Sequence, residues 1–214
     1  MIITAIAVGV TSPGPILFIQ TRVGRHGRLF RCIKFRTMRS GTHSSGSITT
    51  ATDVRITPVG RVLRNWKLDE LPQLWNVLKG EMSFVGPRPD VPGYADQLKG
   101  TDRGVLELFP GITGPATLLF RDEEELLALM NDTKLFNDNV IYPEKLRINL
   151  EYLKKGSFWR DLGYIIATVA PFLTAKTGLD HRLGLDYGAF RQQMSERSLQ
   201  YQGQADIKIP EEPL

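Results

Sequence analysis

The chain has 214 residues, 42% of them hydrophobic, and a formal net charge of +4. This length and apolar content allow one compact domain with a sizeable core. A single cysteine, Cys32, excludes an intramolecular disulfide, and the three histidines are too scattered for a metal-ligand spacing. The sequence contains no Walker loop, no GxGxxG motif and no nucleophile-elbow serine, which argues against the enzyme classes built on those motifs.

The positive charge is concentrated in the first third of the chain. Residues 1–67 carry eleven Lys and Arg residues against a single acid, Asp53, whereas the remainder carries sixteen basic and twenty-two acidic residues. This asymmetry predicts an anionic partner for one face of the protein. Phosphate groups of a substrate, an anionic membrane surface and nucleic acid all fit, and charge alone does not choose among them.

The first segment, residues 1–21, has no charged residue. Its apolar run is about ten residues long, whereas a bilayer-spanning helix needs about twenty. Ser12-Pro13 breaks any helix, and the cationic stretch starts at Arg22. An apolar arm, a proline break and a basic flank favour a segment that dips into one leaflet and returns. A buried core segment of a soluble protein explains the same residues equally well.

The next residues predict a strand hairpin, a loop and a helix. Residues 16–38 alternate apolar and polar side chains around a glycine-bearing turn, which indicates two paired strands. Residues 39–53 are rich in Ser, Thr and Gly and predict a mobile loop. Thr57-Pro58 starts a helix that carries Arg61, Arg64 and Lys67 towards an acidic pair. Cations near that pair are expected to lower carboxylate pKa values and to hold a phosphate.

The acidic pair, Asp69-Glu70, opens the run LDELPQLWNVLKGEMSFVGPRP. Pro72 in a first turn, leucines at helical spacing and Lys79-Gly80 at the end predict a helix capped by Asp69. The positive end of that helix would keep Asp69 ionised, as a nucleophile or metal ligand must be. Taken by themselves, the two acids fit a plain helix cap better than a catalytic pair.

Residues 82–85 predict a short buried strand that ends in Gly-Pro-Arg-Pro. Two prolines around Arg88 restrict its backbone, so its guanidinium loses little entropy on binding a phosphate or a pyrimidine edge. A rigid structural turn is the alternative. Pro110–Pro115 predicts another constrained turn, and Asp122 is expected to cap an acidic, solvated helix.

The last part of the chain predicts helices and a tail. Pro143 starts a helix with leucines at helical spacing, and residues 157–174 predict one apolar helix that packs on the core or lies on a membrane. Residues 178–214 are polar and predict a frayed tail with one helix near residues 187–196. There is no internal repeat and no second domain.

Three motifs in this order, KFRTM at residues 34–38, the run at residues 68–89 and PGITG at residues 110–114, resemble the bacterial sugar transferase family, the monotopic polyprenyl-phosphate phosphoglycosyl transferases. The resemblance covers residues 12–174. It implies an α/β (α+β) fold: a small, mostly helical catalytic domain over residues 12–175 with short strands, preceded by a re-entrant membrane helix within residues 1–21. Relatives usually carry a longer hydrophobic arm, so this helix looks truncated.

The resemblance also implies an activity and a place. The family moves a sugar 1-phosphate from a UDP-sugar to polyprenyl phosphate at the cytoplasmic face of the bacterial inner membrane. Asp69 is the implied nucleophile, forming an aspartyl-phosphosugar intermediate, and Glu70 helps to hold Mg²⁺. Arg64 is expected to neutralise phosphate charge and Arg88 to hold the nucleotide. Lys34 and Arg36 of KFRTM are weaker candidates for the same anionic site.

The chain departs from the common family pattern at two places. Gly114-Pro115-Ala116-Thr117 replaces the usual Gly-Trp-Ala-Gln, and Asn149 stands where many relatives have Asp. The first change leaves the choice of sugar open. The sequence does not name the glycan pathway or the oligomeric state. Two alternative functions remain. One is an inactive membrane-associated relative; the other is a basic nucleic-acid-binding module, which the absence of an RNP-like pattern disfavours.

Overall fold

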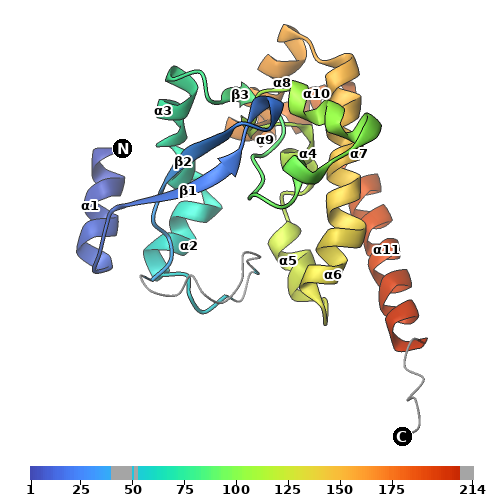
Figure 1. Cartoon of the computed structure of the whole chain (residues 1–214), viewed down its shortest axis with the longest axis horizontal. Helices are drawn as coiled ribbons and strands as arrows, with labels where there is room; N and C mark the ends of the chain where they lie inside the picture. The colour runs from blue at the N-terminus through green and yellow to red at the C-terminus, as the bar shows by residue number, and fades with distance from the viewer. Residues whose placement is uncertain (40–49, 51–52, 208–214) are drawn as a thin grey trace, which may run out of the picture.

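The computed structural model of the chain describes residues 1–39, 50 and 53–207, and side chains as far as residue 202 (Figure 1). The described part is mostly helical, with two small two-stranded sheets, so the prediction of a mixed, mostly helical α/β fold is confirmed. The predicted loop over residues 39–53 lies mainly outside the described residues.

The predicted hairpin is confirmed. Strand β1 (Leu17–Val23) pairs antiparallel with β2 (Leu29–Phe35), and a 3₁₀ turn at Arg25–Gly27 joins them. Helix α2 (Pro58–Asn65) starts where its sequence predicts, with the Thr57 hydroxyl accepting from the Gly60 N–H at 2.9 Å. A Cβ at Gly60 would lie 2.1 Å from the Thr37 carbonyl oxygen, so only glycine lets α2 lie this close to the end of the hairpin.

The helix predicted to start at Asp69 starts later. A 3₁₀ turn at Leu68–Glu70 comes first, and helix α3 spans Gln73–Leu78, so Asp69 caps nothing. The buried face of α3 is polar, and its leucine stripe is only partly covered. Asn76 is fully buried and binds β2 in both directions: its amide nitrogen donates to the Arg31 carbonyl at 2.8 Å and its oxygen accepts from the Ile33 N–H at 3.2 Å.

The two proline-glycine motifs meet backbone to backbone. Strand β3 (Ser83–Val85) pairs in parallel with β4 (Gly111–Thr113). The Gly86 N–H donates to the Thr113 carbonyl at 2.9 Å, and the Gly111 N–H donates to the Pro87 carbonyl at 2.8 Å. A Cβ at Gly111 would lie 2.2 Å from the Gly86 nitrogen, which explains why glycine is needed at this approach. The pairing therefore places the Pro-Arg-Pro turn next to β4 and the start of the helix that follows it.

Helices build the rest of the core. Two 3₁₀ segments, Ala95–Gln97 and Gly100–Glu107, precede β4, and α4 (Pro115–Leu119), α5 (Glu123–Ala128), α6 (Thr133–Phe136), a π-helical turn (Asn137–Ile141) and α7 (Tyr142–Lys155) follow it. The largest buried cluster packs Phe120, Phe136, Ile141 and Met194 together. The start of α7 next to Pro143 confirms that prediction.

The C-terminal part is more ordered than expected. The predicted single helix over residues 157–174 is broken at Pro171 into α8 (Phe158–Val169) and α9 (Pro171–Thr177). Helices α10 (Leu179–Leu183) and α11 (Tyr187–Ile207) follow, and α11 lies along the outside of the α5–α7 region (Figure 1). The expectation of a frayed tail is wrong for these residues, because Leu183, Leu185 and Met194 are buried in the core.

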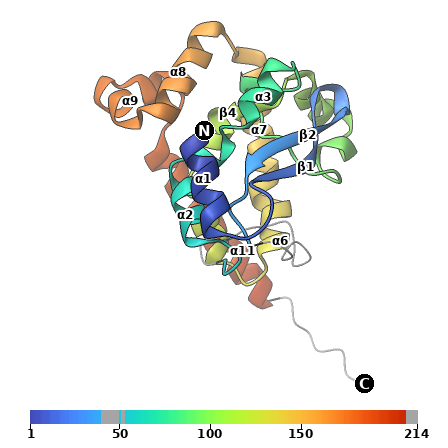
Figure 2. The same cartoon turned by 90° about the vertical axis from the view of Figure 1, so that its left-hand side faces the viewer.

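Helix α1 (Ile2–Thr11) ends at Ser12, as its sequence predicts, and lies beside α2 (Figure 2). Its Val8 packs against Phe35 and Leu63. The opposite side of α1 exposes four large apolar side chains, Ile2, Ile3, Ile6 and Val10. None of the described helices combines the length and the apolar character needed to cross a bilayer.

Candidate functional site

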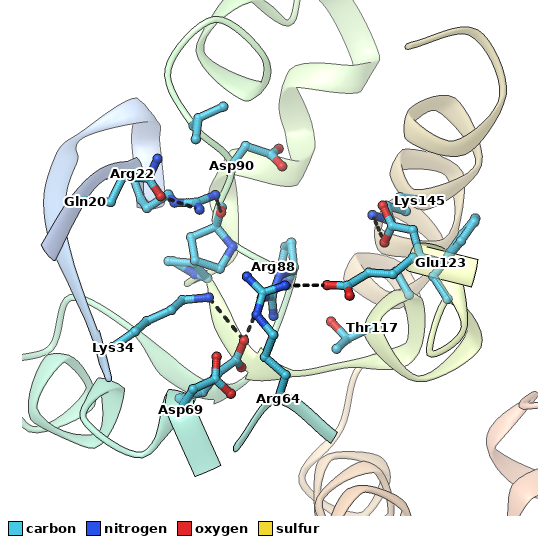
Figure 3. Close-up of a pocket in the computed structure, with 18 of the residues that line it drawn as sticks. Gln20, Arg22, Lys34, Arg64, Asp69, Arg88, Asp90, Thr117, Glu123 and Lys145 are labelled. Carbon is cyan, nitrogen blue, oxygen red and sulfur yellow. Dashed lines mark hydrogen bonds and ion pairs between the residues drawn. The ribbon is translucent and has the colours of Figure 1, made fainter. Parts of the chain in front are cut away.

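Residues from all three sequence motifs line one cavity of about 1410 Å³. The hairpin, α2, the acidic pair, the Pro-Arg-Pro turn, the start of α5 and one face of α7 all line it. Figure 3 shows Lys34 and Asp69 on one side, Glu123 and Lys145 on the opposite side, and Arg64 and Arg88 between them. Segments more than a hundred residues apart in the sequence therefore share one pocket.

The acidic pair is presented to this cavity by an unusual backbone turn. Lys67 has φ of 54°, in the left-handed region, which ends α2 and redirects the chain into the 3₁₀ turn. Asp69 and Glu70 are only 8% and 5% exposed. Two adjacent carboxylates with so little exposure need compensating charges, and the structure gives the two very different surroundings.

Glu70 is ion-paired through one of its oxygens. Its Oε1 accepts from Arg88 Nη2 at 2.6 Å and from Lys34 Nζ at 3.2 Å. Burial would raise the pKa of Glu70, but Arg88 and Lys34 together hold it well below the usual glutamate range. Glu70 is therefore a fixed anion that holds two cations of the pocket in place.

Asp69 is not paired. Its Oδ1 is buried and has no hydrogen-bond partner among the described residues. Burial and the neighbouring charge of Glu70 raise the pKa of Asp69 above the usual aspartate range, against the pull of Lys34, Arg88 and Arg64. The expectation that nearby cations and a helix end would lower this pKa is wrong, because desolvation outweighs them and no helix starts here. The result is an ionisable oxygen with free lone pairs at the edge of a cationic cluster.

The four predicted substrate-binding residues all line the cavity, but they differ in what they contact. Arg64 donates to the Thr37 hydroxyl at 3.0 Å and to Glu124 Oε1 at 3.0 Å. Lys34 and Arg88 contact Glu70, as described. Arg36 donates to the carbonyls of Ser12 and Pro13, so its guanidinium holds the turn after α1 to the hairpin. The structure brings Lys34, Arg64 and Arg88 together and turns Arg36 aside.

Arg88 is positioned from the hairpin side. The Val23 N–H donates to the Asp90 carbonyl at 2.9 Å, and Arg22 Nη1 donates to the Pro89 carbonyl at 3.0 Å. These contacts hold the backbone after Arg88, and the Gly111 N–H bond to the Pro87 carbonyl holds it before Arg88, so the guanidinium needs little further ordering to bind an anion.

Sequence reasoning missed a second group of polar residues in the same cavity. The acidic helix α5 is not simply solvated: Glu123 pairs with Lys145 of α7 at 2.6 Å, and Glu124 pairs with Arg64. Asp122 occupies the N-cap position of α5 without capping it and instead pairs with Arg191 of α11. The spacing of Tyr142, Lys145 and Asn149, which puts polar groups on one face of α7, was a signal that could have found this wall.

The buried carboxyl of Asp90 should make the stability of the folded protein depend on pH. Burial raises its pKa to about 6, although Lys145, Arg22 and a hydrogen bond from Tyr142 favour the charged form. Because the folded protein binds this proton more tightly than the unfolded chain, stability falls as pH rises through about 4 to 6. Asp90→Asn should therefore raise the free energy of unfolding at pH 8 by about 2–3 kcal/mol.

Urea unfolding of both proteins between pH 4 and pH 8 measures this effect. The gain should shrink as the pH falls to 4, where Asp90 is protonated in the folded protein and about half protonated in the unfolded chain. An equal gain at every pH would trace the effect to packing instead.

A divalent metal ion has few ligands here. The described residues contain no group of three or more His, Cys, Asp or Glu side chains suited to a metal ion. Asp69 and Glu70 still fit Mg²⁺, which keeps several waters and is commonly bound by one or two carboxylates plus substrate phosphates. The unpartnered Oδ1 of Asp69 supports that fit, whereas Glu70 Oε1 is already occupied by two cations.

A comparison of the sequence with known protein families shows the family to which the chain belongs. The family model described as "Bacterial sugar transferase" matches residues 1–175. The chain belongs to the bacterial sugar transferase family. Helices α10 and α11 lie beyond the matched residues of this sugar transferase.

Several curated relatives carry informative names. The sugar transferase chain is 35% identical over 181 residues to an Aeromonas hydrophila UDP-N-acetylgalactosamine-undecaprenyl-phosphate N-acetylgalactosaminephosphotransferase, covering 81% of this chain and 39% of that protein. It is 37% identical over 171 residues to the Escherichia coli UDP-glucose:undecaprenyl-phosphate glucose-1-phosphate transferase, covering 77% and 34%. The Caulobacter vibrioides protein of the same name is 36% identical, covering 81% and 62%. The chain thus spans only about a third to three fifths of these relatives.

Proposed function

We propose that this protein moves a sugar 1-phosphate from a UDP-sugar to a polyprenyl phosphate, a reaction that starts assembly of a bacterial surface polysaccharide or glycan. The observation that carries the proposal is the opposite surroundings of two adjacent buried carboxylates. Glu70 is locked to Arg88 and Lys34, whereas Asp69 keeps an oxygen without a partner. Neighbouring acids whose environments push their pKa values apart are typical of divided catalytic roles.

In the first step, an Asp69 oxygen attacks the phosphorus bonded to the sugar. The bond between this phosphorus and the bridging oxygen of the diphosphate breaks, and UMP leaves with the bonding electrons. The sugar phosphate stays on Asp69 as an acyl phosphate. Lys34, Arg64 and Arg88 neutralise the diphosphate so that an anionic carboxylate can approach it. Glu70 holds Lys34 and Arg88 for this task.

In the second step, an oxygen of the polyprenyl phosphate attacks the same phosphorus. The bond to Asp69 breaks, the carboxylate is regenerated, and a polyprenyl-diphosphate sugar is formed. When bound, Mg²⁺ supplies further neutralisation of phosphate charge at the two carboxylates. The raised pKa of Asp69 requires a pH at which this side chain is ionised, because only the carboxylate attacks.

Release of UMP tests the proposal. Purified protein in detergent with Mg²⁺ is given UDP-glucose, UDP-galactose and UDP-N-acetylgalactosamine in turn, with and without undecaprenyl phosphate. We expect continuous UMP release with at least one sugar, and only when the lipid phosphate is present. Binding of these sugars without any turnover would indicate the inactive relative instead.

Contact with a membrane is a second part of the proposal. The lipid acceptor requires it. The four exposed apolar side chains of α1 suit insertion into one leaflet, and the basic residues that start at Arg22 suit contact with anionic headgroups. The exposed aromatic pair Phe158-Trp159 at the start of α8 adds a second apolar surface. In this arrangement α1 dips into the cytoplasmic leaflet and returns at Ser12-Pro13.

Charge in α1 should therefore weaken membrane binding. The double substitution Ile2→Asp and Ile3→Asp adds two charges to side chains that are 78% and 84% exposed, so the fold should not change. We expect at least a tenfold loss of binding to vesicles of anionic phospholipid, measured by co-sedimentation. The control, Leu129→Asp with Leu199→Asp, also adds two charges, at apolar side chains away from α1 that are 70% and 66% exposed. Equal losses in both variants would count against insertion of α1.

A further inference from the structure

The side of the cavity away from Asp69 is built by helices α4 and α7 and by the residue after the Pro-Arg-Pro turn. On α7, Tyr142, Lys145 and Asn149 follow each other at intervals of three and four residues, so they share one face, and all three line the cavity. Thr117 of α4 and Asp90 line it too (Figure 3). None of these residues has a part in the two chemical steps above.

Two polar atoms in this wall are buried without a partner. Asn149 is only 7% exposed, and its Oδ1 has no hydrogen-bond partner among the described residues; the same holds for Oγ1 of Thr117. Leaving such groups unpaired costs stability, so a ligand that pairs them gains that energy on binding. A half-turn of an asparagine amide exchanges its oxygen and nitrogen, so Asn149 can offer an acceptor or a donor to the cavity.

The charges of this wall do not favour an anion, because two carboxylates, Asp90 and Glu123, stand against one lysine, Lys145. Lys145 is 2.6 Å from Glu123, and Tyr142 is hydrogen-bonded to Asp90. The cations that suit phosphate, Lys34, Arg64 and Arg88, lie on the other side or between the two (Figure 3). The wall therefore offers carboxylate, amide and hydroxyl groups with no excess positive charge. Such groups suit a neutral ligand rich in hydroxyls and repel an anionic one.

We propose that Asp90, Thr117, Glu123, Lys145 and Asn149, here named the α7 wall, hold the sugar of the donor and select a neutral, hydroxyl-rich hexose over an anionic sugar. The inference rests on the proposed function. When the diphosphate lies at the cations beside Asp69, the sugar is the next group along the donor, and the α7 wall supplies unpaired polar atoms for it. Its acidic side chains exclude a uronic acid.

Calorimetric titration tests this assignment without any turnover. The probes are UDP, UDP-glucuronic acid and whichever of UDP-glucose, UDP-galactose and UDP-N-acetylgalactosamine binds the wild type most tightly, all with Mg²⁺. The variants are Asn149→Ala and Thr117→Val, each of which removes one unpaired group. The matched control, Asn139→Ala, removes an exposed amide that lies outside the cavity.

We expect each wall variant to weaken the neutral UDP-sugar by about tenfold and UDP by less than twofold, with no effect of Asn139→Ala. Wild type should bind UDP-glucuronic acid at least tenfold more weakly than the neutral sugar. Equal weakening of UDP and UDP-sugar would overturn the inference and assign the wall to the nucleotide, as would unchanged affinity for both. Those results leave the proposed function standing, whereas a wild type that binds none of the probes overturns both.

Discussion

Asp69→Asn should abolish sugar phosphate transfer while leaving the protein folded. An amide oxygen cannot form the acyl phosphate, so we expect UMP release to fall by roughly 1000-fold or more. The folded protein should not suffer, because Asp69 forms no cap and its charge is disfavoured by burial and by Glu70. Its melting temperature at pH 7.5 should be equal to or above that of the wild type.

Trapping of the intermediate tests the same residue directly. With donor labelled in the sugar phosphate and no lipid acceptor, the wild type should carry one label per chain and Asp69→Asn none. Peptide mapping should find the label on Asp69. Substantial turnover by a sequence-verified Asp69→Asn protein would refute the covalent mechanism, and a label on another residue would move the nucleophile there.

Glu70→Gln, unlike Asp69→Asn, should destabilise the folded protein. It removes the charge to which Arg88 and Lys34 are bound and leaves two cations facing each other in the pocket. Because the Arg88 side chain is 41% exposed, water replaces part of the loss, and we expect a cost of about 1–3 kcal/mol. Activity should also be lost, since Lys34 and Arg88 are no longer held.

The two variants are each other's control. The pKa of Glu70 is lowered in the folded protein, so its stabilisation is present above the ordinary glutamate pKa and is lost as the pH falls towards the folded value. Urea unfolding should therefore show Glu70→Gln below wild type at pH 7.5, with the gap narrowing in acid. If Asp69→Asn were the less stable of the two, the assignment of paired and unpaired carboxylates would be wrong.

Local patterns predicted the parts of the fold that local physics controls. The hairpin, helix α2 with its Thr57 cap and the break at Ser12-Pro13 follow from alternation, capping and proline chemistry. The family motifs also led to the residues that meet in the cavity, because Lys34, Asp69 and Arg88 lie within them and Arg64 lies just before the second motif. Which carboxylate is paired did not follow, since the sequence does not reveal that Lys34 and Arg88 both reach Glu70.

Tertiary contacts overruled local patterns elsewhere. The leucine spacing predicted a helix here, yet the residue of α3 that is fully enclosed is Asn76, because it bonds the backbone of β2. The acidic run at α5 looked like a solvated helix because its partners, Arg64 and Lys145, lie 60 and 22 residues away. Long-range ion pairs of this kind leave no local period in a sequence.

The glycine pair that joins β3 to β4 also ties together two halves of the pocket. Arg88 follows Gly86, and the helix that bears Thr117 follows Gly111, so the backbone bonds between these strands connect the side proposed to bind phosphate with the side proposed to bind the sugar. If the pocket opens to admit the proposed donor, we expect these two sides to move together. In hydrogen–deuterium exchange, the amides of Ser83, Gly86 and Gly111 should therefore exchange slowly and at one common rate, as a single cooperative unit.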